Sequence, residues 1–179
     1  MKASRRTRAT APAGETAERQ TGLQEPPART GPALGPEGVR TGVGRERNLG
    51  AMILDAAERY DAVALQFARD GREIEISYRE LGRLSVEIAQ GLIALGIEAG
   101  DRVSVLGLTS ADWTIADCGA LTAGAVVTPI YHTNSSEECA DVLGHSGARL
   151  LFCDANQAAK IAQIRAQCPA LGHVVGAAR

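Results

Sequence analysis

Excess positive charge and long apolar runs are both missing from this sequence. Its 179 residues carry 19 basic and 21 acidic side chains, a formal net charge of -2. A nucleic-acid surface needs a basic excess to release phosphate counterions, so we expect no nucleic acid as a partner. No apolar run reaches the roughly 18 residues that a membrane span requires. We therefore expect no membrane-spanning helix and a cytoplasmic location.

Cysteines in metal-binding or redox spacing are also missing. The four cysteines lie far apart, each in an apolar segment, and no C-x-x-C pair or histidine at ligand distance accompanies them. They are Cys118, Cys139, Cys153 and Cys168. We expect buried, reduced thiols and no metal site.

The first 47 residues lack hydrophobic periodicity. They are a mixture of Arg, Ala, Thr, Gly, Pro and Glu, a composition that buries too little apolar surface to offset chain entropy. An arginine-rich start without a following apolar region does not make a targeting peptide. We expect a disordered tail over residues 1–47 and a structured domain over residues 48–179.

A helix and a hairpin open the expected domain. Asn48 can cap a helix whose apolar residues recur at three and four up to Tyr60. Residues 62–68 and 73–77 read as strands, and Asp70-Gly71 between them is a strong hairpin turn signal. Two antiparallel strands should therefore follow the first helix.

Strands and helices alternate in the rest of the chain. A capping box of Ser77 and Glu80 opens a helix that ends near Gly96, Ser110 can cap a second, and Ser135 with Glu138 a third. Asp154 could cap a last helix that Pro169 stops. The expected strands are 102–106, 125–130, 149–153 and 173–175.

This alternation indicates parallel strands joined by helical crossovers. Right-handed crossovers place helices on both faces of the sheet. The predicted fold class is α/β, with an N-terminal hairpin and helix followed by βαβαβ doubly wound parallel-sheet units, incomplete at the C-terminus. Pro129 limits the second parallel strand, and we interpret Gly119 and Gly124 as points of close approach to the sheet.

Few residues in the sequence suggest chemistry. Gly42-Val43-Gly44 follows no strand and lacks the third glycine of a dinucleotide fingerprint, and no phosphate-binding G-x-x-x-x-G-K-[ST] loop occurs. Tyr131-His132 ends a parallel strand, where such sheets bind ligands, although a loop role is the commoner one. His145 and His173 have no nearby carboxylate or nucleophile in sequence, so we expect structural roles for both.

Several separated blocks, in order, resemble the start of the AMP-forming (adenylate-forming) acyl-CoA synthetase superfamily. The resemblance covers about Leu49 to Val175 and is greatest to long-chain fatty acyl-CoA synthetases, in which a Pro-Ile-Tyr-x-Thr strand end is typical. Thr109, where many members carry Asn, and Asp112, in place of the usual Glu, depart from the pattern. The matching blocks are 77–81, 91–97, 100–103, 124–131 and 146–149.

The resemblance implies a ligase that uses fatty acid, ATP with Mg²⁺, and CoA. It forms an acyl-adenylate and then a thioester, and peripheral contact with a membrane that holds its lipid substrate stays an open question. The family's phosphate loop, nucleotide-binding acids and catalytic Lys all lie beyond the matched segment. We therefore assign no catalytic, cofactor-binding or metal residue to this chain.

Two hypotheses follow from these observations. In the first, the chain is the N-terminal fragment of a long-chain fatty acid–CoA ligase, inactive by itself, whose partner is the missing C-terminal portion of the same enzyme. In the second, it is a short, non-catalytic binding or interaction module that keeps the synthetase scaffold. A sheet that ends near Arg179 should expose an unpaired strand edge and apolar faces, so we also expect aggregation or loose packing.

Overall fold

The structure is a computed structural model that describes residues 48–177. The predicted tail over residues 1–47 lies outside the described residues. Helices and strands alternate after an initial helix and hairpin, as the sequence predicts, and the α/β fold class is confirmed. The elements are α1 Leu49–Arg59, β1 Val63–Arg69, β2 Arg72–Ser77, α2 Tyr78–Ala94, β3 Arg102–Gly107, α3 Ala111–Thr122, β4 Val126–Tyr131, α4 Ser136–Ser146, β5 Leu150–Asp154, the 3₁₀ turn η1 Ala155–Gln157, α5 Ala158–Ile164, the 3₁₀ turn η2 Arg165–Gln167, and β6 His173–Ala177.

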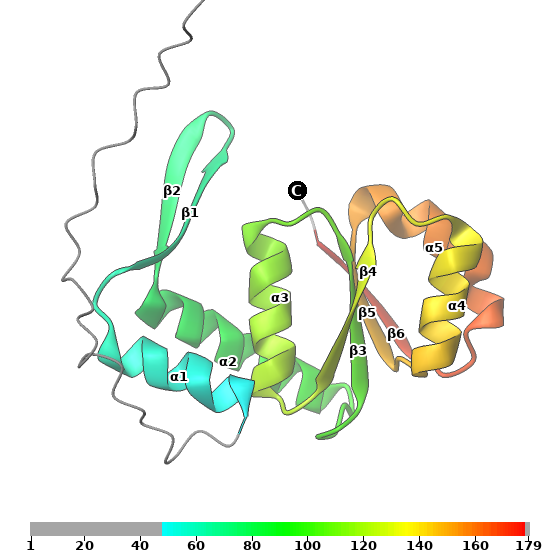
Figure 1. Cartoon of the computed structure of the whole chain (residues 1–179), viewed down its shortest axis with the longest axis horizontal. Helices are drawn as coiled ribbons and strands as arrows, with labels where there is room; N and C mark the ends of the chain where they lie inside the picture. Colours follow the sequence, from blue (N-terminus) through cyan, green and yellow to red (C-terminus); the bar gives the residue numbers. More distant parts are fainter. Residues whose placement is uncertain (1–47, 178–179) are drawn as a thin grey trace, which may run out of the picture. The chain divides into compact units, whose positions relative to one another are not determined.

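The strands form two separate sheets. β1 and β2 make an antiparallel hairpin, and the other four form a parallel sheet in the order β4-β3-β5-β6. Helices α1, α2 and α3 pack together on one face of the parallel sheet, while α4 and α5 lie on the other (Figure 1). The sheet is therefore doubly wound, with β3 and β5 in its centre.

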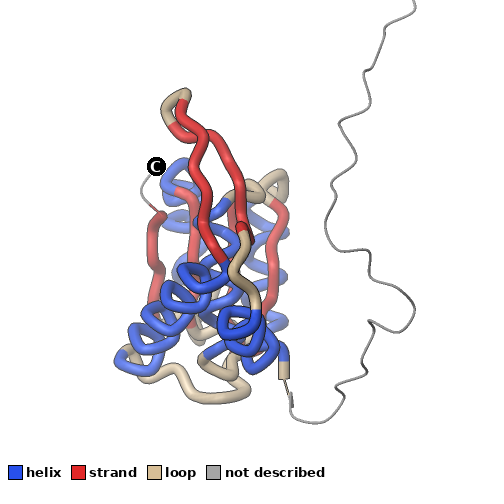
Figure 2. Tube along the Cα trace, turned by 90° about the vertical axis from the view of Figure 1, so that its left-hand side faces the viewer, coloured by secondary structure: helices blue, strands red, loops and turns tan. Residues whose placement is uncertain are grey.

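The hairpin turns through two residues with positive φ. Asp70 has φ 52° and Gly71 φ 72°, which is the backbone that an Asp-Gly hairpin turn requires. Leu65 lies opposite Ile76 in the register, and both side chains are half-buried. Figure 2 shows the hairpin extending beyond the helices that follow and precede it.

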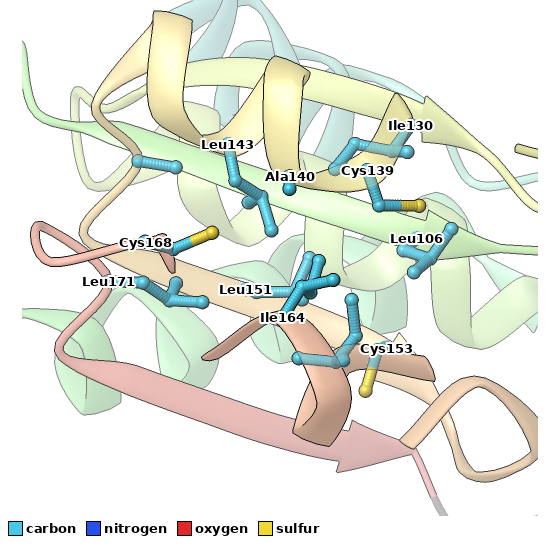
Figure 3. Packing of buried hydrophobic residues seen from close by; sticks show 12 residues of the cluster. Leu106, Ile130, Cys139, Ala140, Leu143, Leu151, Cys153, Ile164, Cys168 and Leu171 are labelled. Atoms are coloured by element: carbon cyan, nitrogen blue, oxygen red, sulfur yellow. The ribbon is translucent and has the colours of Figure 1, made fainter. Parts of the chain in front are cut away.

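Two cores fill the spaces between the sheet and its helices. One lies under α4 and α5 and includes Leu106, Leu143 and Leu151 (Figure 3). The other lies under α2 and α3 and includes Val103 and Leu150. Because Leu150 and Leu151 are neighbours in β5, the strand contributes to both cores, as expected for a strand covered on both faces.

The cysteines behave as small apolar residues. All four are free thiols; Cys139, Cys153 and Cys168 are buried and Cys118 is half-buried. Burial raises the pKa of each thiol. Reactive cysteines have a lowered pKa, so a raised pKa fits a structural role. The prediction of burial is confirmed for Cys139, Cys153 and Cys168, whereas Cys118 is only half-buried.

Local caps form where the sequence places them. The Asn48 side chain accepts a hydrogen bond from the Ala51 N–H at 2.8 Å, Ser110 does the same for Trp113 at 3.1 Å, and Ser135 forms a complete capping box with Glu138. These bonds satisfy amide donors that would otherwise be unpaired in a first helical turn.

The cap of α2 differs in one respect from the prediction. Ser77 accepts a hydrogen bond from the Glu80 N–H at 3.2 Å. The Glu80 carboxylate, however, is bound by Arg83 through contacts of 2.9 and 2.6 Å, and this pairing lowers the pKa of Glu80. A serine cap plus a side-chain ion pair therefore starts the helix.

The amino ends of β3 and β5 are tied together by charged side chains. Asp101 accepts the Glu98 N–H at 2.8 Å and pairs with Arg149 at 2.6 Å. The bond from Glu98, and then the charge of Arg149, lower the pKa of Asp101. Arg102 donates to the Ser146 carbonyl at 2.8 Å, which satisfies an unpaired carbonyl at the end of α4.

Gly119 corrects one interpretation of the sequence. A Cβ at this buried position would overlap the Cβ and Cγ2 atoms of Ile88, so the close approach is between α3 and α2 and not between α3 and the sheet. Gly124 has φ 80° and turns the chain from α3 into β4. Both glycines are required for geometry, one by helix packing and one by a left-handed turn.

Within residues 48–177, no helix combines the length and apolar character needed to cross a membrane.

Candidate functional site

The candidate site lies where the parallel strands end. β3 and β5 are neighbours, but the connection after β3 leads to α3 on one face and the connection after β5 leads to α5 on the other (Figure 1). In open α/β sheets, the crevice at such a switch point is the usual place for a ligand. The residues that end β3 and β5 therefore define the site.

Gly107 and Asp154 meet at this switch point. A Cβ on Gly107 would lie 2.8 Å from both the Cγ and the Oδ1 of Asp154. The Asp154 side chain is 7% exposed, and its Oδ2 accepts the Leu108 N–H at 3.1 Å. Asp154, the last residue of β5, thus binds Leu108, the first residue of the β3–α3 loop. A Cβ at position 107 would overlap the Asp154 carboxylate, so this position requires glycine.

The role of Asp154 differs from the one predicted from the sequence. We expected this residue to cap the helix that follows it, yet its side chain makes no capping hydrogen bond to η1. Its carboxylate reaches the Leu108 amide instead, 46 positions earlier in the chain. The prediction was wrong because a contact with a neighbouring strand outweighs a local one.

A cavity of about 230 Å³ opens beside Asp154, between α3 and strands β3, β5 and β6. This volume is below the approximately 300–1,000 Å³ of typical ligand pockets. Apolar side chains dominate the lining, and the acidic groups are Asp112 and Asp154. Cys153 also lines the cavity; burial, and then the charge of Asp154, raise the pKa of its thiol, so it stays protonated and is a poor nucleophile.

Arg69 connects the hairpin to this region. Its Nη2 atom lies 3.1 and 2.9 Å from the two carboxylate oxygens of Asp112, in the first turn of α3. Asp112 lies in the first turn of α3, as predicted from the sequence, where its negative charge interacts favourably with the positive end of the helix dipole. The pair therefore ties the last residue of β1 to Asp112, which lines the cavity.

Tyr131 and His132, the strand end that the sequence singled out, lie at the same edge on β4. Tyr131 is 80% exposed and pairs in register with Gly107. Lys160 of α5 donates to the carbonyls of His132 and Asn134, at 3.2 and 2.5 Å. Lys160 thus fixes the loop after β4 through two backbone carbonyls, and these bonds do not involve the His132 imidazole.

The other two histidines lie away from this edge. His145 is exposed in the last turn of α4, and His173 begins β6 at the opposite end of that strand. In the described part of the chain, no group of three or more His, Cys, Asp or Glu residues could hold a metal ion. The arrangement therefore positions backbone groups at the carboxyl edge of the sheet.

A doubly wound parallel sheet with a switch point defines the class: an α/β domain of the nucleotide-binding type. The family is defined by sequence. The model of the AMP-binding enzyme family matches residues 54–178, and the chain belongs to that family.

Curated relatives carry the names of long-chain fatty acid–CoA ligases. The chain is 36% identical over 135 residues to FadD15 of Mycobacterium bovis, covering 74% of this chain and 22% of that protein. It is 34% identical over 126 residues to human ACSBG1, covering 69% of this chain and 17% of the relative. The chain thus spans about a fifth of the length of the curated relatives it matches.

Solved structures agree with this assignment. A fatty acyl CoA synthetase from Mycobacterium tuberculosis superposes with a TM-score of 0.65 at 29% identity, over 73% of this chain and 26% of that one. The N-terminal domain of FACL13 from the same organism gives 0.66 at 28% identity, over 74% of this chain and 34% of that domain. The resemblance to acyl-CoA synthetases that the sequence blocks suggest is confirmed.

Sequence reasoning missed the residues that organise this edge. Gly107, Arg69 and Lys160 were not singled out, and Asp154 was given a different role. The available signal was small: an aspartate at the end of one buried strand and a glycine at the end of another. Only the strand order, which places β5 beside β3, brings the two together.

Proposed function

We propose that this chain forms the N-terminal scaffold portion, over residues 48–179, of an ATP-dependent long-chain fatty acid–CoA ligase. The observation that carries the proposal is the match of residues 54–178 to the AMP-binding enzyme family, together with relatives named as long-chain fatty acid–CoA ligases. The proposal includes a cytoplasmic location for the whole enzyme and contact with the membrane periphery, where a lipid substrate would be collected.

The proposed reaction has two steps. A carboxylate oxygen of the fatty acid attacks the α-phosphorus of ATP and pyrophosphate leaves, which gives an acyl-adenylate. The thiol of CoA then attacks the acyl carbon and AMP leaves, which gives the thioester and releases the thiol proton. Stabilising charge on the transferring group requires preorganised cations and donors, supplied by Mg²⁺ and by lysine or backbone amides.

The residues described here do not fit ATP or Mg²⁺. No metal-binding group is present among residues 48–177, and Lys160, the lysine in this range, donates to two backbone carbonyls. We therefore assign the chain no step of the reaction. Its proposed role is to form the sheet and fix the strand-end loops through Asp154 and Lys160.

The test is acid-dependent exchange of labelled pyrophosphate into ATP. The 179-residue chain should give no exchange with palmitate above a mock preparation, while intact FadD15 of Mycobacterium bovis, the relative named above, serves as the positive control. Exchange by the chain alone would overturn the scaffold assignment. Reading the nucleotide sequence after the codon for Arg179 separates the two hypotheses: an in-frame phosphate loop supports the ligase, and a stop without one supports a short binding module.

A further inference from the structure

The loop between β4 and α4 is held by side chains from one face of α5. The Lys160 Nζ donates to the carbonyls of His132 and Asn134, at 3.2 and 2.5 Å. Three positions further along the same helix, the side-chain carbonyl of Gln163 accepts a hydrogen bond from the Ser136 hydroxyl at 3.2 Å. Residues three apart lie on the same face of a helix, so α5 fixes both the loop and the first residue of α4.

The backbone of the loop is also closed by a turn of its own. The Asn134 N–H donates to the Tyr131 carbonyl at 3.0 Å, so the Tyr131 carbonyl is paired within the loop while the carbonyls of His132 and Asn134 are paired with Lys160. These bonds join residues within the described range, and they do not depend on what packs over the loop from outside. The loop therefore has one defined backbone shape.

The chemistry of lysine suits this arrangement. Lys160 is the only lysine among residues 48–177, where the other permanently charged cations are arginines. An ammonium group carries three donors on one nitrogen, whereas a guanidinium spreads its donors over a planar fork. One nitrogen can thus bind two carbonyls that converge on it. Ordering so long a side chain costs conformational entropy, and the result of that ordering is a fixed loop.

The fixed loop lies at the ligand-binding edge of the sheet. Tyr131, at the end of β4, pairs in register with Gly107 of β3, and Gly107 meets Asp154 at the switch point. Asp154 also binds the first amide of the loop after β3. Asp154 and Lys160 both belong to the β5–α5 segment, so this one segment fixes two neighbouring loops at the edge where such sheets bind ligands.

We propose that Lys160 is a positioning residue of the ligase, which holds the β4–α4 loop in the shape that binds a substrate and touches no reacting atom itself. The inference rests on the proposed function and adds to it a residue that sets the strength of substrate binding. A loop that is fixed before the substrate arrives loses less conformational entropy on binding. Removing the ammonium should therefore raise KM and leave kcat almost unchanged, as expected when ground-state and transition-state binding weaken equally.

The test uses the complete polypeptide whose reading frame contains this sequence. Lys160→Met keeps a long, unbranched side chain but removes the charge and the donors. It should raise KM for at least one of palmitate, ATP and CoA about tenfold, with kcat within about twofold of the wild type. Lys160→Arg, which can still donate to both carbonyls, should restore that KM to within about threefold. Lys160→Gln keeps an uncharged donor, guards against misfolding of the methionine variant, and should raise the same KM.

Arg165→Met is the matched control. Arg165 follows α5 and also donates to two backbone carbonyls, those of Leu171 and Gly172, but these precede β6 at the opposite, amino end of the sheet. Its loss should lower stability without changing any KM. Hydrogen exchange of the Asn134 amide reports on the loop directly: exchange should be faster in Lys160→Met and unchanged in Arg165→Met.

The outcomes distinguish the positioning role from the proposed function. A wild-type enzyme that forms palmitoyl-CoA, together with Lys160 variants unchanged in every KM, would overturn the positioning role alone. Equal changes of KM in Lys160→Met and Arg165→Met would also overturn it, because they would indicate a general loss of stability. A folded wild type without ligase activity would overturn the proposed function, and the positioning role with it.

Discussion

Replacing Gly107 by alanine tests the contact that organises the carboxyl edge. The new methyl carbon would lie 2.8 Å from the Asp154 Cγ and 3.0 Å from its Oδ2, closer than packed atoms approach, so either the carboxylate turns away or β3 shifts. Losing the Leu108 hydrogen bond to the carboxylate costs about 1.5–3 kcal/mol, and over-packing costs about 1–3 kcal/mol. The structure should adopt whichever of these two changes costs less free energy, so we expect the free energy of unfolding to fall by about 2 kcal/mol.

Urea unfolding followed by the fluorescence of Trp113, the single tryptophan, measures this change, because Trp113 lines the adjacent cavity. Gly176→Ala is the control, since a Cβ there meets no atom within 4 Å, so it should not lower the free energy of unfolding. In an Asp154→Ala background, Gly107→Ala should cost markedly less, because the overlapping carboxylate is gone. Equal costs in both backgrounds, or a Gly107→Ala variant as stable as the wild type, would refute the reasoning.

Three further predictions concern other parts of the domain. Gly119→Ala should lower the free energy of unfolding by about 1–3 kcal/mol, because its Cβ would overlap Ile88, whereas Gly91→Ala, an exposed site of α2 in open space, should raise it by about 0.5–1 kcal/mol. The Ser104 hydroxyl is buried and has no hydrogen-bond partner among the described residues, so Ser104→Ala should leave stability unchanged or raise it by about 1 kcal/mol. The pKa of Asp101 is lower in the folded chain, so its contribution is present above the ordinary aspartate pKa and is lost as pH falls through the folded value; Asp101→Asn should remove that acid-side loss. Urea unfolding at a series of pH values checks all three, and they would be contradicted respectively by greater stability of Gly119→Ala, a loss in Ser104→Ala, or an unchanged acid limb in Asp101→Asn.

Features that depend on a few neighbouring residues could be predicted from the sequence. The caps at Asn48, Ser110 and Ser135 and the turn at Asp70-Gly71 each involve contacts within about four positions, and all four form. The alternation of strands and helices likewise gave the fold class, because parallel strands need a crossover between them.

Features that depend on strand order could not be predicted. The sequence does not state that β5 lies between β3 and β6, so the contact of Asp154 with Gly107 was invisible, and Asp154 was interpreted by its local role as a cap. The interpretation of Gly119 was wrong for the same reason. A glycine indicates that two elements approach closely, but the sequence does not say which residue is the neighbour, and here it is Ile88 of α2.

The central claim is that the described sheet belongs to a long-chain fatty acid–CoA ligase, and product formation tests it most directly. The polypeptide from the complete reading frame that contains this sequence should be incubated with palmitate, ATP, Mg²⁺ and CoA, and the products measured by mass spectrometry. We predict palmitoyl-CoA and AMP in equal amounts, dependent on all three substrates. Absence of palmitoyl-CoA from a folded, complete polypeptide, with fatty acids of other chain lengths also unreactive, would contradict the account.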